Sequence, residues 1–144
     1  MENIIDTRDL AERRDELKTR ILDAFNYTFF TELDCCPDIE TLSDNIPENA
    51  TKEDKELFFS DWKDEINEIN EIDEIEHYCP DFEFGCTLIH YDYFTEYTKE
   101  LLIDCGYISK DFPTWIEIDW NATAENVMYD YSEINYRGET YLFR

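Results

Sequence analysis

Residues 53–76 constrain the fold most, because their hydrophobic side chains recur every three or four positions. This spacing places them along one side of an α-helix, whereas a half-buried β-strand requires alternation at every second position. The apolar stripe consists of Phe58, Trp62, Ile66, Ile69, Ile72 and Ile75. We therefore predict one helix over residues 53–76 whose stripe packs against a first helix or against a second subunit.

The other positions of this stretch are mostly acidic, with eleven aspartates and glutamates against two lysines, Lys55 and Lys63. A continuous helix of this length extends about 36 Å, so its net negative charges lie roughly 4 Å apart along the axis. B-DNA carries about one charge per 3.4 Å along each strand. The predicted charge density is therefore close to that of one phosphate strand. The acids expected to face outward and to bind a partner are Asp61, Asp64, Glu65, Glu68, Glu71, Asp73, Glu74 and Glu76.

The whole chain shares this acidity, with a formal net charge of -25 over 144 residues. Such a charge disfavours direct binding to nucleic acid or to an anionic membrane, and favours basic partners, divalent cations or a high-salt habitat. Abundant large hydrophobic side chains argue against the high-salt reading, and 42% hydrophobic residues are enough for a core. We find no secretory signal and no apolar run of transmembrane length. Together with an odd number of cysteines, which indicates free thiols, this predicts a cytoplasmic protein.

The sequence divides into two regions, which together predict the α+β class. Residues 1–77 are expected to form a helical hairpin, in which a first helix over residues 4–25, capped by Asp6 or Thr7, runs antiparallel to the acidic helix. The arginines and lysines of the first helix would then face carboxylates of the second. The same pairing is compatible with a homodimer.

Residues 78–144 are expected to form a small α+β module. Its predicted elements are a strand over residues 82–89 bent at Gly85, a helix over 91–105 ended by Gly106, a short helix capped by Asp119, and a terminal β-hairpin over 131–136 and 139–143. The aromatic residues assigned to its core are Trp115, Trp120, Tyr131, Tyr141 and Phe143.

No motif indicates catalysis. Carboxylates are so abundant that their pairing carries no information, and the only two histidines, His77 and His90, are interpreted as surface or edge residues. Nucleophile elbow, Walker loop, HExxH and dinucleotide fingerprint are all missing from the sequence. We therefore predict that the protein is not an enzyme and needs no cofactor.

Metal binding is also not predicted. Cys79 and Cys86 are seven positions apart, wider than the usual zinc spacing, so buried free thiols are favoured over a zinc site that uses His77 and His90. The acidic stretch contains isoleucines where a calcium loop needs its central glycine. The adjacent Cys35 and Cys36, in the connection between the two helices, are likewise interpreted as free thiols.

The C-terminal region resembles the ArdA antirestriction family, and in particular its phage-borne relatives. The resemblance covers residues 82–144 and, more weakly, residues 4–17. It is carried by Phe94-Thr95-Glu96-Tyr97, Glu100-Leu101, Gly106-Tyr107-Ile108, Pro113 to Ala122, Asp130-Tyr131, Tyr141 to Arg144 and Ile5 to Leu10. It implies an elongated acidic dimer that imitates bent B-DNA and occupies the DNA groove of Type I restriction–modification enzymes. The predicted N-terminal hairpin departs from the three-module layout of that family.

Two functional hypotheses follow. In the first, the protein inhibits a bacterial defence complex, either a Type I restriction–modification enzyme or a CRISPR effector, by occupying its basic DNA-binding groove in the host cytoplasm. In the second, apolar helical surfaces bind the partner, and acidity serves only solubility and steering. Salt distinguishes them, because only the first kind of interface weakens steeply as ionic strength rises.

Overall fold

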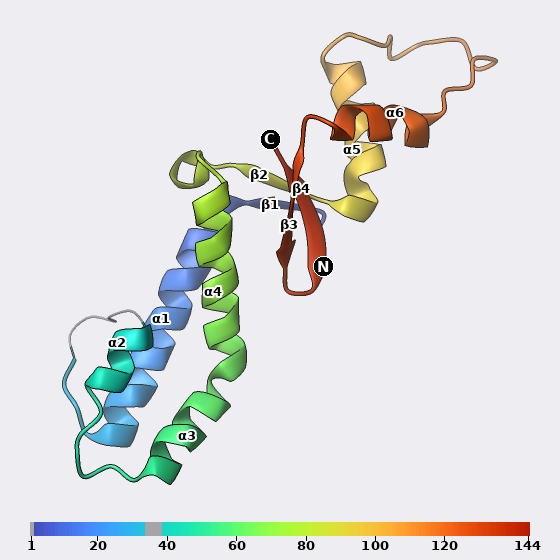
Figure 1. Ribbon diagram of the computed structural model, residues 1–144. Helices are drawn as coiled ribbons and strands as arrows, with labels where there is room; N and C mark the ends of the chain where they lie inside the picture. The colour runs from blue at the N-terminus through green and yellow to red at the C-terminus, as the bar shows by residue number, and fades with distance from the viewer. Residues whose placement is uncertain (1, 34–38) are drawn as a thin grey trace. The chain divides into compact units, whose positions relative to one another are not determined.

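The computed structural model describes residues 2–33 and 39–144 and has an α+β fold (Figure 1), as predicted. Cys35 and Cys36 lie outside the described residues. The elements are β1 (Ile4–Asp6), α1 (Thr7–Phe29), α2 (Ile39–Asp44), α3 (Lys52–Asp61), α4 (Lys63–Tyr78), the 3-10 turns η1 (Phe82–Phe84) and η2 (Tyr91–Tyr93), β2 (Thr87–His90), α5 (Phe94–Asp104), α6 (Trp120–Met128), β3 (Ser132–Tyr136) and β4 (Glu139–Phe143).

The chain forms two compact units. The helical unit is Asp9–Tyr78, and the sheet unit combines the residues up to Arg8 with Cys79–Arg144. We had expected residues 1–77 to form one region and residues 78–144 another. The first residues of the chain instead join the sheet unit, because β1 pairs antiparallel with β2.

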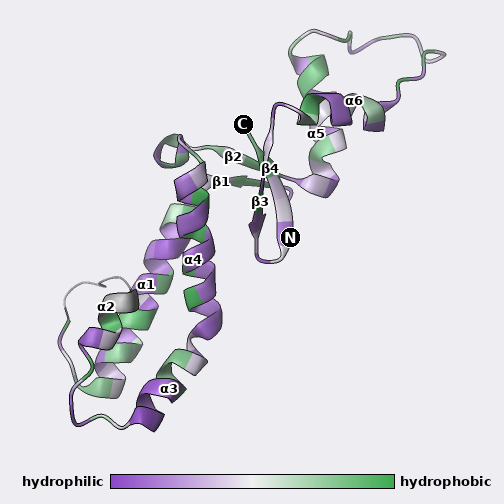
Figure 2. Cartoon of the chain, viewed as in Figure 1, coloured by the Kyte–Doolittle hydropathy of each residue, from purple (hydrophilic) through white to green (hydrophobic). Residues whose placement is uncertain are grey.

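The core of the helical unit is built from the apolar sides of its helices. Leu17, Ile21 and Phe25 of α1 are fully buried together with Ile69 of α4. Phe58 of α3 stands edge-on against both Phe25 and Phe29, with ring centroids 5.5 Å apart in each pair. Hydrophobic and strongly hydrophilic residues alternate along α4 (Figure 2), as expected of a helix with one buried side.

The predicted single helix over residues 53–76 is interrupted at Trp62, which separates α3 from α4. The Trp62 N–H still donates to the Phe58 carbonyl at 3.2 Å, and the Trp62 carbonyl accepts from the Ile66 N–H at 2.9 Å. No proline or glycine lies at this point. The bend accompanies the aromatic packing of Phe58, and it means that the acids do not follow one straight axis of about 36 Å.

The N-terminal end of α1 also differs from the prediction. Residues 4–6 form a strand rather than the first turn of the helix, because the β-branched Ile4 and Ile5 pair with Ile89 and Leu88. Asp6 then caps the helix, since its carboxylate accepts the Arg8 backbone N–H at 2.9 Å.

The four strands form one antiparallel sheet in the order β1-β2-β4-β3. Ile89 and Leu142 lie on the face covered by α5 and α6, where they pack with Phe94 and Ala124. Most side chains of the opposite face, seven of them, are buried as well. They are Ile5, Leu88, His90, Ile134, Tyr136, Tyr141 and Phe143.

Several local predictions for the sheet unit are confirmed. The terminal hairpin turns at Arg137 and Gly138, whose φ angles of 52° and 78° are those of a type I′ turn. Gly106 follows α5 with a φ of 79°, and the Asp119 carboxylate accepts the Ala122 N–H at the start of α6. The predicted strand over residues 82–89 is wrong in its first half, since Phe82–Phe84 form η1 and β2 begins at Thr87. Gly85 lies between them with a φ of 97°, and a side chain there would meet the Arg8 guanidinium, with Nε 2.8 Å from an added Cβ.

Thr7 joins distant parts of the sheet unit. Its fully buried hydroxyl donates to the Phe82 carbonyl and accepts the Cys86 N–H, both at 2.8 Å. We predict that Thr7→Val lowers the free energy of unfolding by roughly 2–4 kcal/mol, because two buried backbone groups lose their partner. Urea denaturation measures this change.

Two controls test that reason. Thr7→Ser retains the hydroxyl and should recover most of the loss. Thr98→Val should be neutral or stabilising, since the buried Thr98 hydroxyl has no hydrogen-bond partner among the described residues. Equal losses for Thr7→Val and Thr7→Ser would contradict the assigned role of the hydroxyl.

Candidate partner-binding surface

The pairing of α1 with α4 rests on two consecutive arginines, as the sequence analysis anticipated. Arg13 donates from Nε to Glu68 Oε1 at 3.0 Å, and it also lies 3.7 Å from the Glu16 carboxylate. Glu68 is buried, so this pair is an internal contact of the helical unit. A buried carboxylate is tolerated because the guanidinium neutralises it and satisfies its oxygens.

Arg14 makes the second contact. It donates to Asp73 Oδ1 at 2.7 Å and also to Glu76, and only 16% of its side chain is exposed. Burial by itself lowers the pKa of the Arg14 guanidinium, but hydrogen bonds to Glu76 and Asp73 outweigh it, so the pKa is raised. One cation therefore holds two carboxylates of α4.

The eight acids predicted to bind a partner fall into two groups, according to whether they pair with Arg13 or Arg14. Glu68, Asp73 and Glu76 bind arginines of the same unit, and Glu68 is in addition buried. Asp61, Asp64 and Glu74 are exposed, whereas Glu65 and Glu71 are half-buried. The sequence could not make this division, because carboxylates that face a helix and carboxylates that face solvent are the same residue types.

The outer side of α1 carries acids that the sequence reasoning missed. Arg13 and Arg14 hydrogen-bond to carboxylates of α4, whereas these acids of α1 face solvent. The spacing of these acids indicates that they share one side of the helix, since they recur three, four and seven positions apart. They are Asp9, Glu12, Glu16 and Asp23, all exposed.

The ion pairs show which edges of the two helices meet. Asp9 and Glu16 lie one turn to either side of Arg13, so they share its edge of α1. Asp64 and Glu71 lie one turn to either side of Glu68 on α4. Because Arg13 pairs with Glu68, both edges border one face of the hairpin. This acidic face consists of Asp9, Glu16, Asp64 and Glu71, with the Arg13–Glu68 pair between its two rows.

The dimensions of the acidic face follow from helix geometry. Packed helix axes lie about 8–10 Å apart, which sets the separation of the two rows. Seven residues separate the members of each row, or roughly 10 Å along each helix. Two lines of negative charge also border each groove of B-DNA, across about 6 Å in the minor groove and about 12 Å in the major groove.

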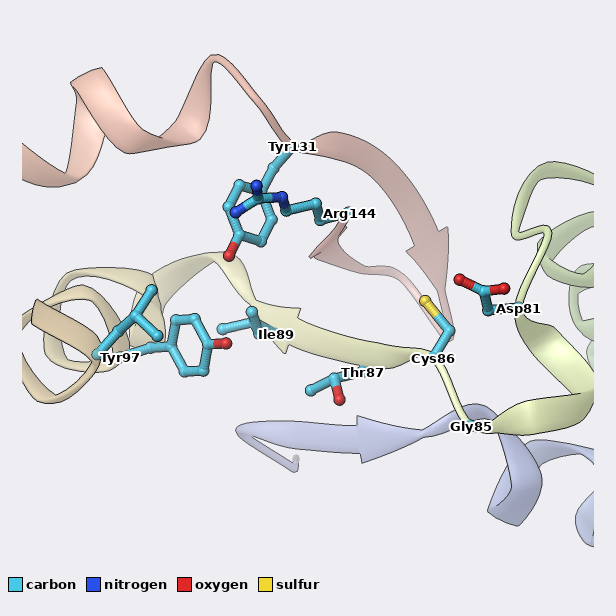
Figure 3. A pocket seen from close by; sticks show the side chains of 9 residues that line it. Asp81, Gly85, Cys86, Thr87, Ile89, Tyr97, Tyr131 and Arg144 are labelled. Carbon is cyan, nitrogen blue, oxygen red and sulfur yellow. The ribbon is translucent and has the colours of Figure 1, made fainter. Parts of the chain in front are cut away.

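The sheet unit contains a hollow of about 350 Å³ between the sheet and α5 (Figure 3). Ile89 and Thr87 line its middle, Arg144 and Tyr131 lie to one side, and Tyr97 and Cys86 lie at opposite ends. Burial raises the pKa of the Cys86 thiol to about 12, with the neighbouring Cys79 contributing. The thiol is therefore protonated at neutral pH and is a poor nucleophile.

A second hollow, of about 390 Å³, contains His90 together with acidic residues. We had interpreted His90 as a surface or edge residue, but it is buried on the internal strand β2. Its Nδ1 accepts the Asp92 N–H at 3.1 Å, and its Nε2 lies 2.9 Å from Glu139. Both ring nitrogens are thus engaged in structural hydrogen bonds, in the tautomer that carries its proton on Nε2.

Residues 2–33 and 39–144 contain neither a metal-binding cluster nor a membrane-spanning helix. In these ranges no three histidine, cysteine or acidic side chains converge to hold a metal ion. No helix in the same ranges is long and apolar enough to cross a bilayer. Comparison of the chain with protein families, curated proteins and solved structures gives no match.

We predict that Arg14→Gln lowers the free energy of unfolding by roughly 1–3 kcal/mol, because Asp73 and Glu76 lose their shared cation. The loss should shrink at about 1 M salt, where the Debye length is about 3 Å. The exposed Arg20 is the matched control, and Arg20→Gln should change stability by less than about 0.5 kcal/mol. Equal effects of the two substitutions would mean that Arg14 does not hold the helices together.

Proposed function

We propose that this protein is a DNA decoy that inhibits a bacterial DNA-binding defence complex by occupying its basic groove. The targets most consistent with the C-terminal resemblance are Type I restriction–modification enzymes, and CRISPR effectors offer the same kind of groove. The inhibitor acts stoichiometrically and undergoes no chemical change. We place it in the bacterial cytoplasm, where such complexes bind DNA.

The observation that carries this proposal is the acidic face of the helical unit. Its two rows of carboxylates lie on two packed helices, whose axes are typically about 8–10 Å apart, a distance between the widths of the two DNA grooves. Arg13 and Arg14 are engaged by acids of α4, and exposed acids outnumber exposed lysines and arginines on both helices. Two further exposed acids, Asp61 of α3 and Glu74 of α4, add to the negative charge of this unit.

The energetics of such a surface require many weak contacts. One exposed carboxylate that meets a lysine or arginine contributes about 0–1 kcal/mol. A DNA groove presents many cations, which normally release counterions when they bind phosphates. Several carboxylates held by packed helices can compete for these cations without a large ordering cost. Single substitutions should therefore have small effects, whereas combined substitutions should weaken binding strongly.

The alternative hypothesis requires an apolar helical surface that is open to a partner. The stripe that it would use is buried in the described structure: Ile69, Ile72 and Ile75 are each at most 2% exposed. This burial favours the decoy over an interface made by the apolar side of α4.

We predict that the triple variant Asp9→Asn, Glu16→Gln, Asp64→Asn displaces DNA from a purified Type I methyltransferase at least about tenfold less effectively than the unchanged protein. The physical reason is the loss of three carboxylates from the acidic face. Fluorescence anisotropy of labelled duplex DNA, titrated with each protein at low salt, measures the displacement.

A matched control removes the same number of charges elsewhere in the helical unit. Glu32→Gln, Asp44→Asn, Glu48→Gln changes three exposed acids outside the acidic face. This variant should displace DNA within about threefold of the unchanged protein. Equal weakening by both variants would show that total charge matters and that the acidic face does not.

A further inference from the structure

The segment between α5 and α6 exposes aromatic side chains that a core would normally bury. It leaves α5 and returns to α6 as a long loop (Figure 1). Trp115 and Tyr107 are each 81% exposed in it, and Ile116 is 38% exposed. We had assigned Trp115 to the core of this region, and that assignment is wrong. We call residues 105–119 the aromatic loop.

The backbone of the aromatic loop is fixed where it presents these side chains. Tyr107 lies three positions after Asp104, the last residue of α5, and its N–H donates to the Leu102 carbonyl at 3.0 Å. Trp115 lies within a turn closed by the Ile116 N–H and the Pro113 carbonyl at 3.0 Å. An aromatic side chain on an ordered backbone loses little conformational freedom on binding. Trp120 differs, because it is half-buried in α6 and Lys99 lies over its ring.

Charge around the aromatic loop indicates the partner. Lys110 is its one base, whereas its acids are all exposed. These acids are Asp111, Glu117 and Asp119, with Asp104 at the end of α5. A second copy of this chain also carries a net charge of -25, so self-association through this loop is electrostatically unfavourable. Aromatic groups rimmed by carboxylates complement an apolar surface rimmed by lysine and arginine.

We propose that Trp115 and Tyr107 are apolar anchors for a basic protein partner, and that this contact does not depend on salt. The contact adds to the acidic face a second point of binding to the same partner, and to that extent it rests on the proposed function. Phosphates dominate the sequence-independent affinity of DNA for a basic groove, so such anchors let a protein inhibitor hold its target when ionic strength weakens the charge pairs. Tryptophan and tyrosine are the residues most often found at such energetic centres of interfaces.

Two peptide probes test the anchors independently of the target. One is a helical peptide of leucine and lysine, and the other is a polylysine peptide of the same charge. The unchanged protein should retain binding to the leucine–lysine peptide at about 1 M salt but should release polylysine there. The double variant Tyr107→Ala, Trp115→Ala should bind the leucine–lysine peptide at least about tenfold more weakly, a loss of about 1.4 kcal/mol. Its affinity for polylysine should remain within about twofold.

Tyr27→Ala is the matched control, because Tyr27 is an aromatic residue 85% exposed on α1. It should bind both peptides as the unchanged protein does. Circular dichroism should show all variants folded, since these side chains are exposed. The proposal is overturned if the double variant binds the leucine–lysine peptide within about twofold of the unchanged protein, or if that peptide and polylysine are released at the same salt concentration.

The same variants separate this inference from the proposed function. If the unchanged protein fails to displace DNA from the methyltransferase at low salt, the decoy proposal fails and the peptide result still decides the anchors. If it displaces DNA and the double variant does so equally well at every salt concentration, the decoy stands and the anchors have no part in that complex.

Discussion

The pairing of Arg13 and Arg14 with acids of α4 determines how the rest of the helical unit is arranged. The chain has 37 acidic residues and 12 lysines and arginines, so few cations are available to pair with the carboxylates of α4. Arg13 neutralises Glu68 on one edge of the contact, and Arg14 holds Asp73 and Glu76 on the other. Burial of Leu17, Ile21 and Ile69 supplies the apolar part of the stabilisation. Because Arg13 and Arg14 are engaged by α4, exposed acids outnumber exposed lysines and arginines on both helices.

The sequence predicted the features that depend on local chemistry. A positive φ at Gly106 and at the Arg137-Gly138 turn, and the Asp119 cap, follow from the conformational preferences of a few adjacent residues. The antiparallel hairpin was also foreseen, because helix periodicity and the distribution of arginines indicate it without any distant information.

The predictions that were wrong share a physical cause, since the structure at each of these positions depends on contacts between distant parts of the chain. Ile4 and Ile5 form a strand only because β2 lies beside them. The helix break at Trp62 has no local breaker and accompanies the packing of Phe58 on α1. Hydropathy did not separate the exposed Trp115 from the half-buried Trp120. Glu68 resembled its acidic neighbours until its pairing with Arg13 was visible.

The two inferred binding features differ in how salt affects them. Screening weakens the carboxylates of the acidic face, whereas burial of aromatic rings from the aromatic loop is insensitive to it. A protein with both can associate rapidly by electrostatic steering and remain bound through apolar contacts.

The affinity of the unchanged protein for a purified Type I methyltransferase, measured from low to moderate salt by calorimetry, tests the decoy account most directly. The account predicts that the logarithm of the association constant falls steeply with the logarithm of salt concentration, and that the Asp9, Glu16 and Asp64 triple variant shows a shallower slope. It also predicts that saturating duplex DNA abolishes binding. An affinity that stays constant across the salt range, or a complex that binds DNA and this protein together, would contradict it.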